Sequence, residues 1–232
     1  MNLIKERLQQ KKSFIDEVGT SKNNMIEKNA YMYHVVQQLD NKRKLFNQES
    51  AMHRDILVKN LCVKYNVIPI ASVILPTHTH DIFIADDISN ISNVLRYANR
   101  GTSTFIRNER AQKNMSELKH IFVTCPGYVA IKTRQQLMYL VKYLYDNPAY
   151  LKQSGEYIPY SCFDSWEKNY FKPYDIALLE KILEIDITQI LELCKTLDKE
   201  HFESFCRDKY EHDSSQLNDN LFMKDKSLGW SF

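Results

Sequence analysis

The 232-residue chain is predicted to be an α+β protein with a mostly antiparallel sheet. Strand-like runs rich in Val, Ile, Phe and Tyr alternate with segments whose apolar residues recur at helical spacing. Their order is strand, helix, strand, helix, hairpin, helix, which favours helices packed on an antiparallel sheet. The length allows one substantial core or two small domains, and we favour one core with extensions.

The N-terminal part is expected to alternate between helix and strand. Apolar residues at roughly helical spacing predict a helical extension in residues 1–28, and residues 31–39 have the composition of a strand. An apolar stripe over residues 50–65 predicts a helix that leads into a strand within residues 72–84.

A second helix and a hairpin are expected next. Amphipathic spacing predicts a helix over residues 89–98. Residues 120–124 and 128–132 have the composition of short strands, and Pro126 followed by Gly127 suits a type II turn between them. These two strands are therefore expected to pair with each other.

The C-terminal part is predicted to be helical. A helix over residues 133–148 should end near Pro148, because proline cannot donate the next backbone hydrogen bond. Residues 173–213 are expected to form a subdomain of short amphipathic helices, whose acidic side chains disfavour a DNA-binding helix-turn-helix module. Residues 214–232 are a polar tail.

The composition limits the classes of protein that the chain can represent. With 31 basic and 29 acidic residues and a formal charge of +2, the chain lacks the strong positive field of a non-specific DNA coat protein. Five widely spaced cysteines without a Cys-x-x-Cys pair indicate neither a disulfide framework nor a thiolate zinc site. Charges near the start do not suit a signal peptide, and no run approaches the ~18 apolar residues of a membrane span. A cytoplasmic protein with no membrane partner is therefore expected.

A pair of histidines is the first candidate site. His78 and His80 lie two residues apart in a strand-like run, so both imidazoles project from one face and can share one cation. An isolated pair of this kind is more often structural, with one ring buried and the other in water. A metal site therefore needs a further donor elsewhere in the chain.

A second candidate group lies near the end of the helix predicted before Pro148. Tyr143 and Asn147 are four residues apart, which places a phenol hydroxyl and an amide oxygen on one face. The chain has 14 tyrosines, so a tyrosine taken at random serves packing. Tyr139 lies one turn earlier on the same stripe and is the competitor for a nucleophile, whereas Tyr145 is rotated about 200° away.

Both groups resemble motifs of one protein family. The run Leu75-Pro-Thr-His-Thr-His-Asp-Ile-Phe83 is similar to the Met-Pro-Asn-His-x-His strand of single-tyrosine HUH transposases, most closely the REP-associated tyrosine transposases. The run Tyr143-Leu-Tyr-Asp-Asn-Pro148 resembles their Tyr-(Ile/Val)-x-x-Asn-Pro helix end. The resemblance covers about residues 30–172, and it departs from the family pattern at Thr79 and Asp81.

This resemblance implies a fold and an activity. The family fold is a ferredoxin-like antiparallel sheet, which agrees with the element order and would make residues 29–172 a catalytic domain. Tyr143 would be the catalytic nucleophile that forms a 5′-phosphotyrosine intermediate. His78, His80 and Asn147 would bind Mg²⁺ or Mn²⁺, since two imidazoles and an amide suit a labile cation rather than closed structural zinc. The expected partner is single-stranded or hairpin DNA, bound by a monomer or a homodimer.

A cluster of basic residues is a candidate DNA-binding surface. The second predicted helix and the segment after it, up to His120, hold six basic residues against two acidic ones, although such a stretch is by default a solvated helix face. Similarity to the family favours Arg96, Arg100 and Arg107 as contacts to the DNA backbone. Tyr97 would then offer a stacking surface for unpaired bases.

Two other functions remain open from the sequence. The first is a catalytically silent, domesticated DNA-binding protein that keeps the same fold, to which Thr79, Asp81 and the modest net charge point. The second is an unrelated metallohydrolase that uses His-x-His. The chain is short for the barrel of such hydrolases and lacks an evident further set of histidine and lysine ligands.

Overall fold

The computed structural model describes residues 31–123, 125–153, 159–163 and 176–211. The predicted N-terminal extension and C-terminal tail lie outside these residues, and the division into domains stays a prediction. Within the described ranges, none of the helices has the length and apolar character needed to cross a membrane.

The centre of the molecule is a five-stranded sheet in which each described strand pair is antiparallel. Its strands are β1 (Met32–Gln38), β2 (Ile68–Leu75), β3 (His78–Ile84), β4 (Gly127–Ala130) and β5 (Tyr160–Ser161). They lie in the order β4-β1-β3-β2-β5, and the chain runs β1, helix, β2, β3, helix, β4. This is the βαββαβ arrangement of a ferredoxin-like fold with β5 added at one edge, so the predicted fold class is confirmed.

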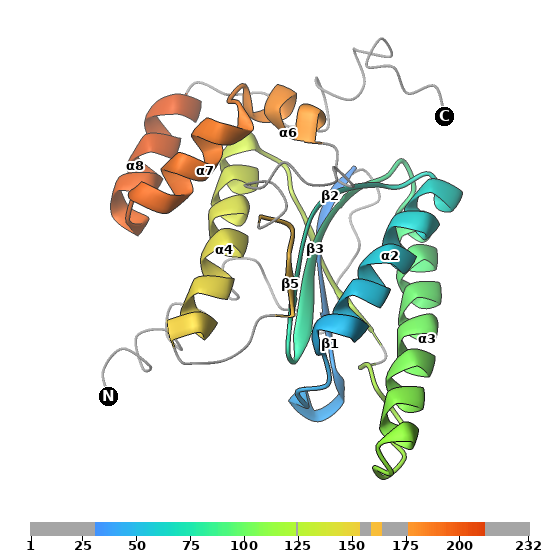
Figure 1. Cartoon of the computed structure of the whole chain (residues 1–232). Helices are drawn as coiled ribbons and strands as arrows, with labels where there is room; N and C mark the ends of the chain where they lie inside the picture. Colours follow the sequence, from blue (N-terminus) through green and yellow to red (C-terminus); the bar gives the residue numbers. More distant parts are fainter. Residues whose placement is uncertain (1–30, 124, 154–158, 164–175, 212–232) are drawn as a thin grey trace.

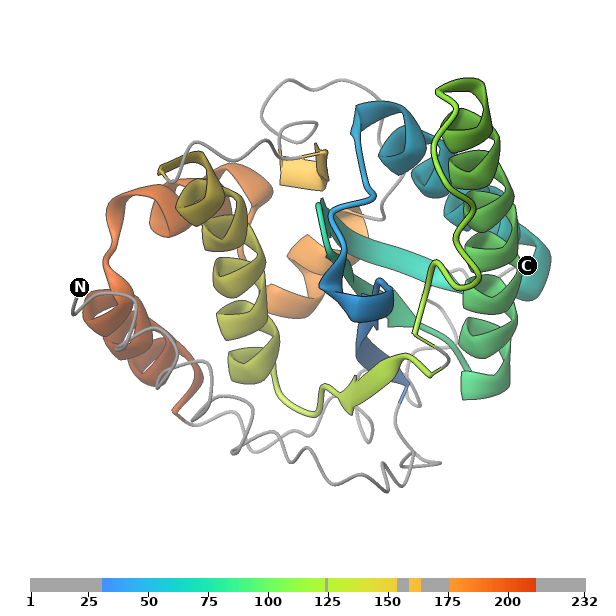
Figure 2. The same ribbon diagram turned by 90° about the horizontal axis from the view of Figure 1, so that it is seen from below.

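Helices cover both faces of the sheet (Figures 1 and 2). One face carries α2 (Gln48–Tyr65) and α3 (Ile88–Gln112). The opposite face carries α4 (Arg134–Gln153), which contacts the C-terminal helices α6 (Ile176–Leu183), α7 (Ile187–Thr196) and α8 (Lys199–Tyr210). A short 3-10 turn, η1 (Asp40–Lys42), follows β1. The sheet therefore separates two helical layers.

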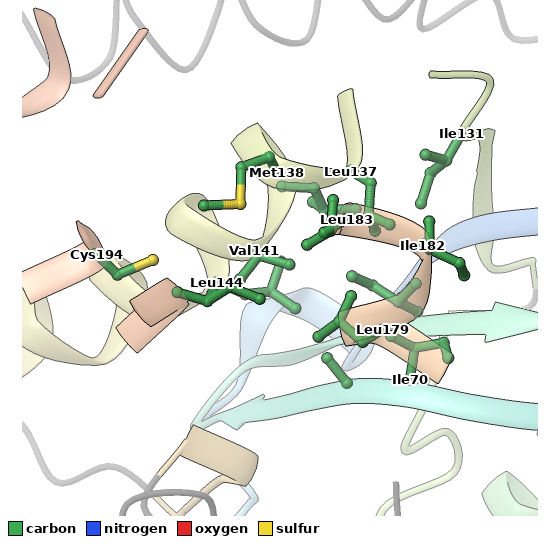
Figure 3. Packing of buried hydrophobic residues seen from close by; sticks show 14 of the residues in the cluster. Ile70, Ile131, Leu137, Met138, Val141, Leu144, Leu179, Ile182, Leu183 and Cys194 are labelled. Atoms are coloured by element: carbon green, nitrogen blue, oxygen red, sulfur yellow. The ribbon is translucent and has the colours of Figure 1, made fainter. Parts of the chain in front are cut away.

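The apolar side of α4 is buried between the sheet and the C-terminal helices. Figure 3 shows Leu137 and Val141 of α4 gathered with Leu179 and Ile182 of α6 and Ile70 of β2, and all five are buried. Because these side chains belong to one core cluster, α4 is packed on two sides. This packing fixes the helix that carries Tyr143.

Local sequence explains where several helices begin. Asn47 and Ser50 form a capping box at the start of α2, and the side chain of Asp87 accepts a hydrogen bond from a backbone amide at the start of α3. Thr133 accepts a hydrogen bond from the backbone amide of Gln136, as expected for an N-cap. The strand predicted over residues 31–39 and the helix predicted over residues 50–65 are confirmed within a few residues.

The run that contains the histidines is two strands rather than one. β2 and β3 pair with each other, with Leu75 opposite His78, and a turn at Pro76 and Thr77 joins them. The prediction of a single strand within residues 72–84 was wrong. The turn has only two residues, Pro76 and Thr77, and contains no glycine, so composition alone does not reveal it.

The hairpin predicted over residues 120–132 is also wrong. Phe122 forms a bridge with Leu39, and β4 pairs with β1, where Gly127 lies opposite Val36. Both runs therefore lie along β1 instead of along each other. The edge of β1 that faces away from β3 needs hydrogen-bond partners. Pairing both runs with this edge satisfies more of the backbone groups of β1.

Two helices are longer than expected. α3 continues to Gln112, and α4 continues past Pro148 to Gln153. A proline removes one backbone donor from a helix, and α4 tolerates this loss without ending. Tyr143 therefore lies in the middle of α4 rather than in its last turns.

Candidate active site

Strand β3 sends alternate side chains to opposite faces of the sheet. His78, His80 and Ile82 point to the face that α4 covers, where Ile82 belongs to the same apolar cluster as Val141. Thr79, Asp81 and Phe83 point to the face that α2 and α3 cover. The two predicted metal ligands thus share one face, as their spacing indicated.

A third histidine joins this face from β1. His34 lies opposite Ile82, so it is a diagonal neighbour of His80 on the adjacent strand. Nε2 of His34 is 2.9 Å from Nδ1 of His80, and the two buried rings are stacked with centroids 5.2 Å apart. Burial lowers the pKa of His34 to about 4, although the carboxylate of Asp81 opposes this shift. His34 is therefore neutral at pH 7.

His78 lies beside His80, but its Nδ1 has a different hydrogen-bond partner. The two rings are edge to face with centroids 4.9 Å apart, and Nδ1 of His78 is 2.8 Å from the hydroxyl of Thr77. Nδ1 of each histidine therefore faces a polar neighbour, His34 in one case and Thr77 in the other. A cation held by this pair would be bound through Nε2 of both rings.

Tyr143 of α4 reaches the histidine face. Its ring is edge to face with that of His80, with centroids 5.4 Å apart. Its hydroxyl is hydrogen-bonded to the side chain of Asn147, one turn further along α4. Burial raises the pKa of Tyr143 above its usual value, and its hydrogen bond with the Asn147 side chain lowers it in part. The phenol is therefore protonated at neutral pH.

The competing tyrosines have other neighbours. The hydroxyl of Tyr139 accepts a hydrogen bond from Gln135 at 2.8 Å and donates one to the backbone oxygen of Glu203 in α8 at 3.4 Å. The ring of Tyr145 packs edge to face on Phe163, with centroids 5.4 Å apart. Among these three tyrosines, Tyr143 is the one with a described ring contact to the histidine pair.

A buried ion pair occupies the other face of β3. Arg54 of α2 donates hydrogen bonds of 3.2 and 2.7 Å to the two oxygens of Asp81, and both side chains are fully buried. The hydroxyls of Ser72 and Thr79 donate to the same carboxylate at 2.7 and 3.1 Å. The residues that depart from the family motif thus belong to a buried network that points away from the histidines.

The donors on the histidine face fit a labile cation better than a closed metal cage. Within the described parts of the chain, no three His, Cys, Asp or Glu side chains are grouped to hold a metal. A cation at His78 and His80 would need another kind of ligand, and the amide of Asn147 lies on the helix that contacts this face. Two imidazoles and an amide oxygen leave positions for water and phosphate oxygens.

The predicted DNA contacts are on the opposite helical layer. Arg96 and Arg100 are exposed on α3, and the guanidinium of Arg96 lies 4.8 Å from the centre of the Tyr97 ring. Arg107 donates to the backbone oxygens of Leu118 and Lys119 at 3.3 and 3.1 Å, so it holds the segment after α3. These arginines do not join the histidines, and Arg107 has a structural role.

The predicted stacking residue Tyr97 already has an aromatic neighbour. It is stacked with Tyr65 of α2 at 5.8 Å. Tyr97 remains 40% exposed, although the guanidinium of Arg96 also lies over its ring.

Sequence reasoning missed His34 and Arg54. His34 has no ligand spacing in the sequence, because its proximity to His80 follows from the pairing of β1 with β3 rather than from local sequence. Its position two residues from Met32 and Val36 did place it on one face of the first strand. The pairing register, had it been known, would have identified it.

Comparisons with known proteins add a similarity to a solved structure. No family model matches the sequence, and no curated protein matches it either. A solved structure of a REP-associated tyrosine transposase bound to a REP hairpin is similar, with 18% identity over 62% of this chain and 84% of that chain and a TM-score of 0.44. What this chain does is therefore inferred from its own side chains.

Proposed function

We propose that this protein is a metal-dependent endonuclease and strand transferase of single-stranded DNA that works through a 5′-phosphotyrosine. The observation that supports this most is the contact of the Tyr143 ring with His80, one of two histidines on the same strand face. A phenol beside a pair of potential metal ligands is the combination that such chemistry needs.

Tyr143 would act as the nucleophile. Its phenol oxygen forms a bond to phosphorus while the bond from phosphorus to the 3′ oxygen breaks, and the phenol proton is balanced by the proton that the leaving 3′-hydroxyl gains. The energy of the phosphodiester is kept in the phosphotyrosine, so another 3′-hydroxyl can reverse the step and join strands. No external energy source is required.

The neighbouring residues would prepare this attack. A protonated phenol is a weak nucleophile, and a bound Mg²⁺ or Mn²⁺ would supply Lewis-acid polarisation of the scissile phosphate. His78 and His80 would hold that ion, with Asn147 as a further ligand or as the hydrogen-bond partner that orients the Tyr143 hydroxyl. The close packing of α4 would keep the phenol in line with phosphorus.

DNA would be bound as a single strand or a hairpin end. The exposed cations of α3 are few, and Tyr97 beside them offers an aromatic surface to an unpaired base. The formal charge of +2 is small for a protein that binds duplex DNA through phosphates alone.

The second candidate is a catalytically silent DNA-binding protein with the same fold. It is motivated by the modest formal charge of +2. The positions of Thr79 and Asp81 do not favour it, because both serve the ion pair on the other face.

End-labelled oligonucleotides separate the two candidates. With Mn²⁺, the parent protein is expected to release a 5′-labelled fragment with a free 3′-hydroxyl and to retain the 3′-labelled fragment on the protein. Tyr143→Phe should bind the same DNA without releasing a fragment. Chelation of the Mn²⁺ by EDTA should stop cleavage by the parent protein. Binding without cleavage of any single-stranded or hairpin substrate in a library would support the silent protein instead.

A further inference from the structure

The strongest feature outside the predicted site is the contact between His34 and His80. It is a buried side-chain hydrogen bond between two histidines on adjacent strands, and each imidazole is neutral when it carries one ring proton. Since the contact joins Nε2 of His34 to Nδ1 of His80, one of these two nitrogens donates and the other accepts. The direction of this bond decides what the other nitrogen of His80 can do.

The two directions have opposite consequences for a metal. If His80 donates from Nδ1, its proton is on that nitrogen and Nε2 has a lone pair that can bind a cation. If His34 donates instead, neutral His80 carries its proton on Nε2 and cannot bind a cation there. In proteins, a histidine that binds a metal commonly donates its other ring N–H to a fixed acceptor.

We propose that His34 is a positioning residue, whose Nε2 accepts the Nδ1–H of His80 and so holds His80 in the tautomer that exposes an Nε2 lone pair. The consequence for metal binding rests on the proposed function, whereas the tautomer itself does not. His34 touches neither DNA nor the reacting atoms in this account, so it acts through His80.

The fold gives His34 a rigid position for this task. β1 lies between β4 and β3, so its backbone is paired on both sides. The His34 ring is stacked on His80 with an angle of 13° between the planes, which fixes the second ring as well. The neighbour of His78 differs, because the Thr77 hydroxyl can either donate or accept and therefore selects no tautomer.

Nitrogen NMR of the metal-free parent tests the tautomer directly. In ¹⁵N-labelled protein, correlations between ring nitrogens and ring carbon-bound protons identify which nitrogen of each histidine is protonated. We expect His80 to be protonated on Nδ1 and His34 to have an unprotonated Nε2. A His80 ring protonated on Nε2 would overturn the proposal, whether or not the protein cleaves DNA.

Variants test the consequence for metal affinity. His34→Phe keeps a flat ring but removes the acceptor, and its Mn²⁺ affinity by calorimetry should fall about 10- to 100-fold. His34→Gln offers an amide oxygen as acceptor and should retain most of the affinity. His53→Phe is the matched control, because His53 stacks on Phe105 at 4.4 Å in the α2–α3 layer, and it should leave the affinity unchanged.

The outcomes distinguish this inference from the proposed function. A folded His34→Phe that binds Mn²⁺ like the parent would overturn the role of His34 even if the parent cleaves DNA. If His34→Phe does not fold, the role of His34 is tested by the Mn²⁺ affinity of His34→Gln and by the tautomer of His80 in the parent. A parent with the expected tautomer but no cleavage would refute the proposed activity and leave the role of His34 standing.

Discussion

The two faces of strand β3 use polar side chains in different ways. On the α2 face, the carboxylate of Asp81 is enclosed by Arg54, Ser72 and Thr79, and the ion pair is fully buried. On the α4 face, the ring of His80 contacts the imidazole of His34 and the phenol of Tyr143. Both of these neighbours carry a titratable group. The same seven-residue strand thus combines a closed network with a reactive group of side chains.

This difference indicates which polar residues serve stability. A buried charge is tolerated when hydrogen bonds enclose it, and removing one partner leaves the other charge unpaired. Neutral imidazoles cost less to bury and keep nitrogens for ligands. Thr79 and Asp81 therefore stabilise the fold, whereas His78 and His80 are expected to serve chemistry.

Breaking the ion pair should give the largest change in stability. Arg54→Ala would leave Asp81 buried without its guanidinium partner, at a cost of about 3–5 kcal/mol in the free energy of unfolding. Urea titration followed by circular dichroism measures this cost. Arg100→Ala, at an exposed position on α3, is the control and should leave the urea midpoint unchanged. A loss below about 1 kcal/mol in Arg54→Ala would show that the network contributes little.

Changing the histidines should affect metal binding more than stability. Calorimetric titration with Mn²⁺ should give a signal for the parent and none for His78→Ala or His80→Ala. Because His78 is half-buried and His80 is buried, the unfolding free energy should fall less in His78→Ala. If either variant binds Mn²⁺ like the parent, the metal assignment is wrong.

The arginines of α3 should divide into a structural and a DNA-binding group. Arg107→Ala removes the hydrogen bonds to Leu118 and Lys119 and should cost about 1 kcal/mol in stability. Arg100→Ala should keep its stability but reduce the salt dependence of single-stranded DNA binding, by about 0.7 in the logarithmic slope. Gel-shift titrations at several salt concentrations check the second part, and an unchanged slope would remove Arg100 from the DNA contacts.

Selectivity for unpaired DNA is the smallest effect expected. The few exposed cations beside Tyr97 should favour single-stranded and hairpin probes over a matched duplex. Parallel gel shifts with the three probes at physiological salt measure the ratio. Equal affinity for all three would contradict a role for the aromatic surface.

Local patterns predicted the elements better than their partners. Alternation placed His78 and His80 on one face, and helical spacing placed Tyr143 and Asn147 on one stripe. The position of His34 depends on the register between β1 and β3, which no local pattern contains. The same reason explains why the predicted hairpin was wrong, because residues 121–130 pair along the edge of β1 that faces away from β3.

Identifying the residue that becomes linked to DNA tests the central claim most directly. The parent is incubated with Mn²⁺ and single-stranded or hairpin substrates, denatured and digested with a protease, and the peptide that carries a nucleotide is sequenced by mass spectrometry. We predict that the nucleotide is on Tyr143, that Tyr143→Phe forms no adduct, and that Tyr139→Phe and Tyr145→Phe still form it. An adduct on Tyr139 or another residue, or no adduct with any substrate, would contradict the assignment of Tyr143 as the nucleophile.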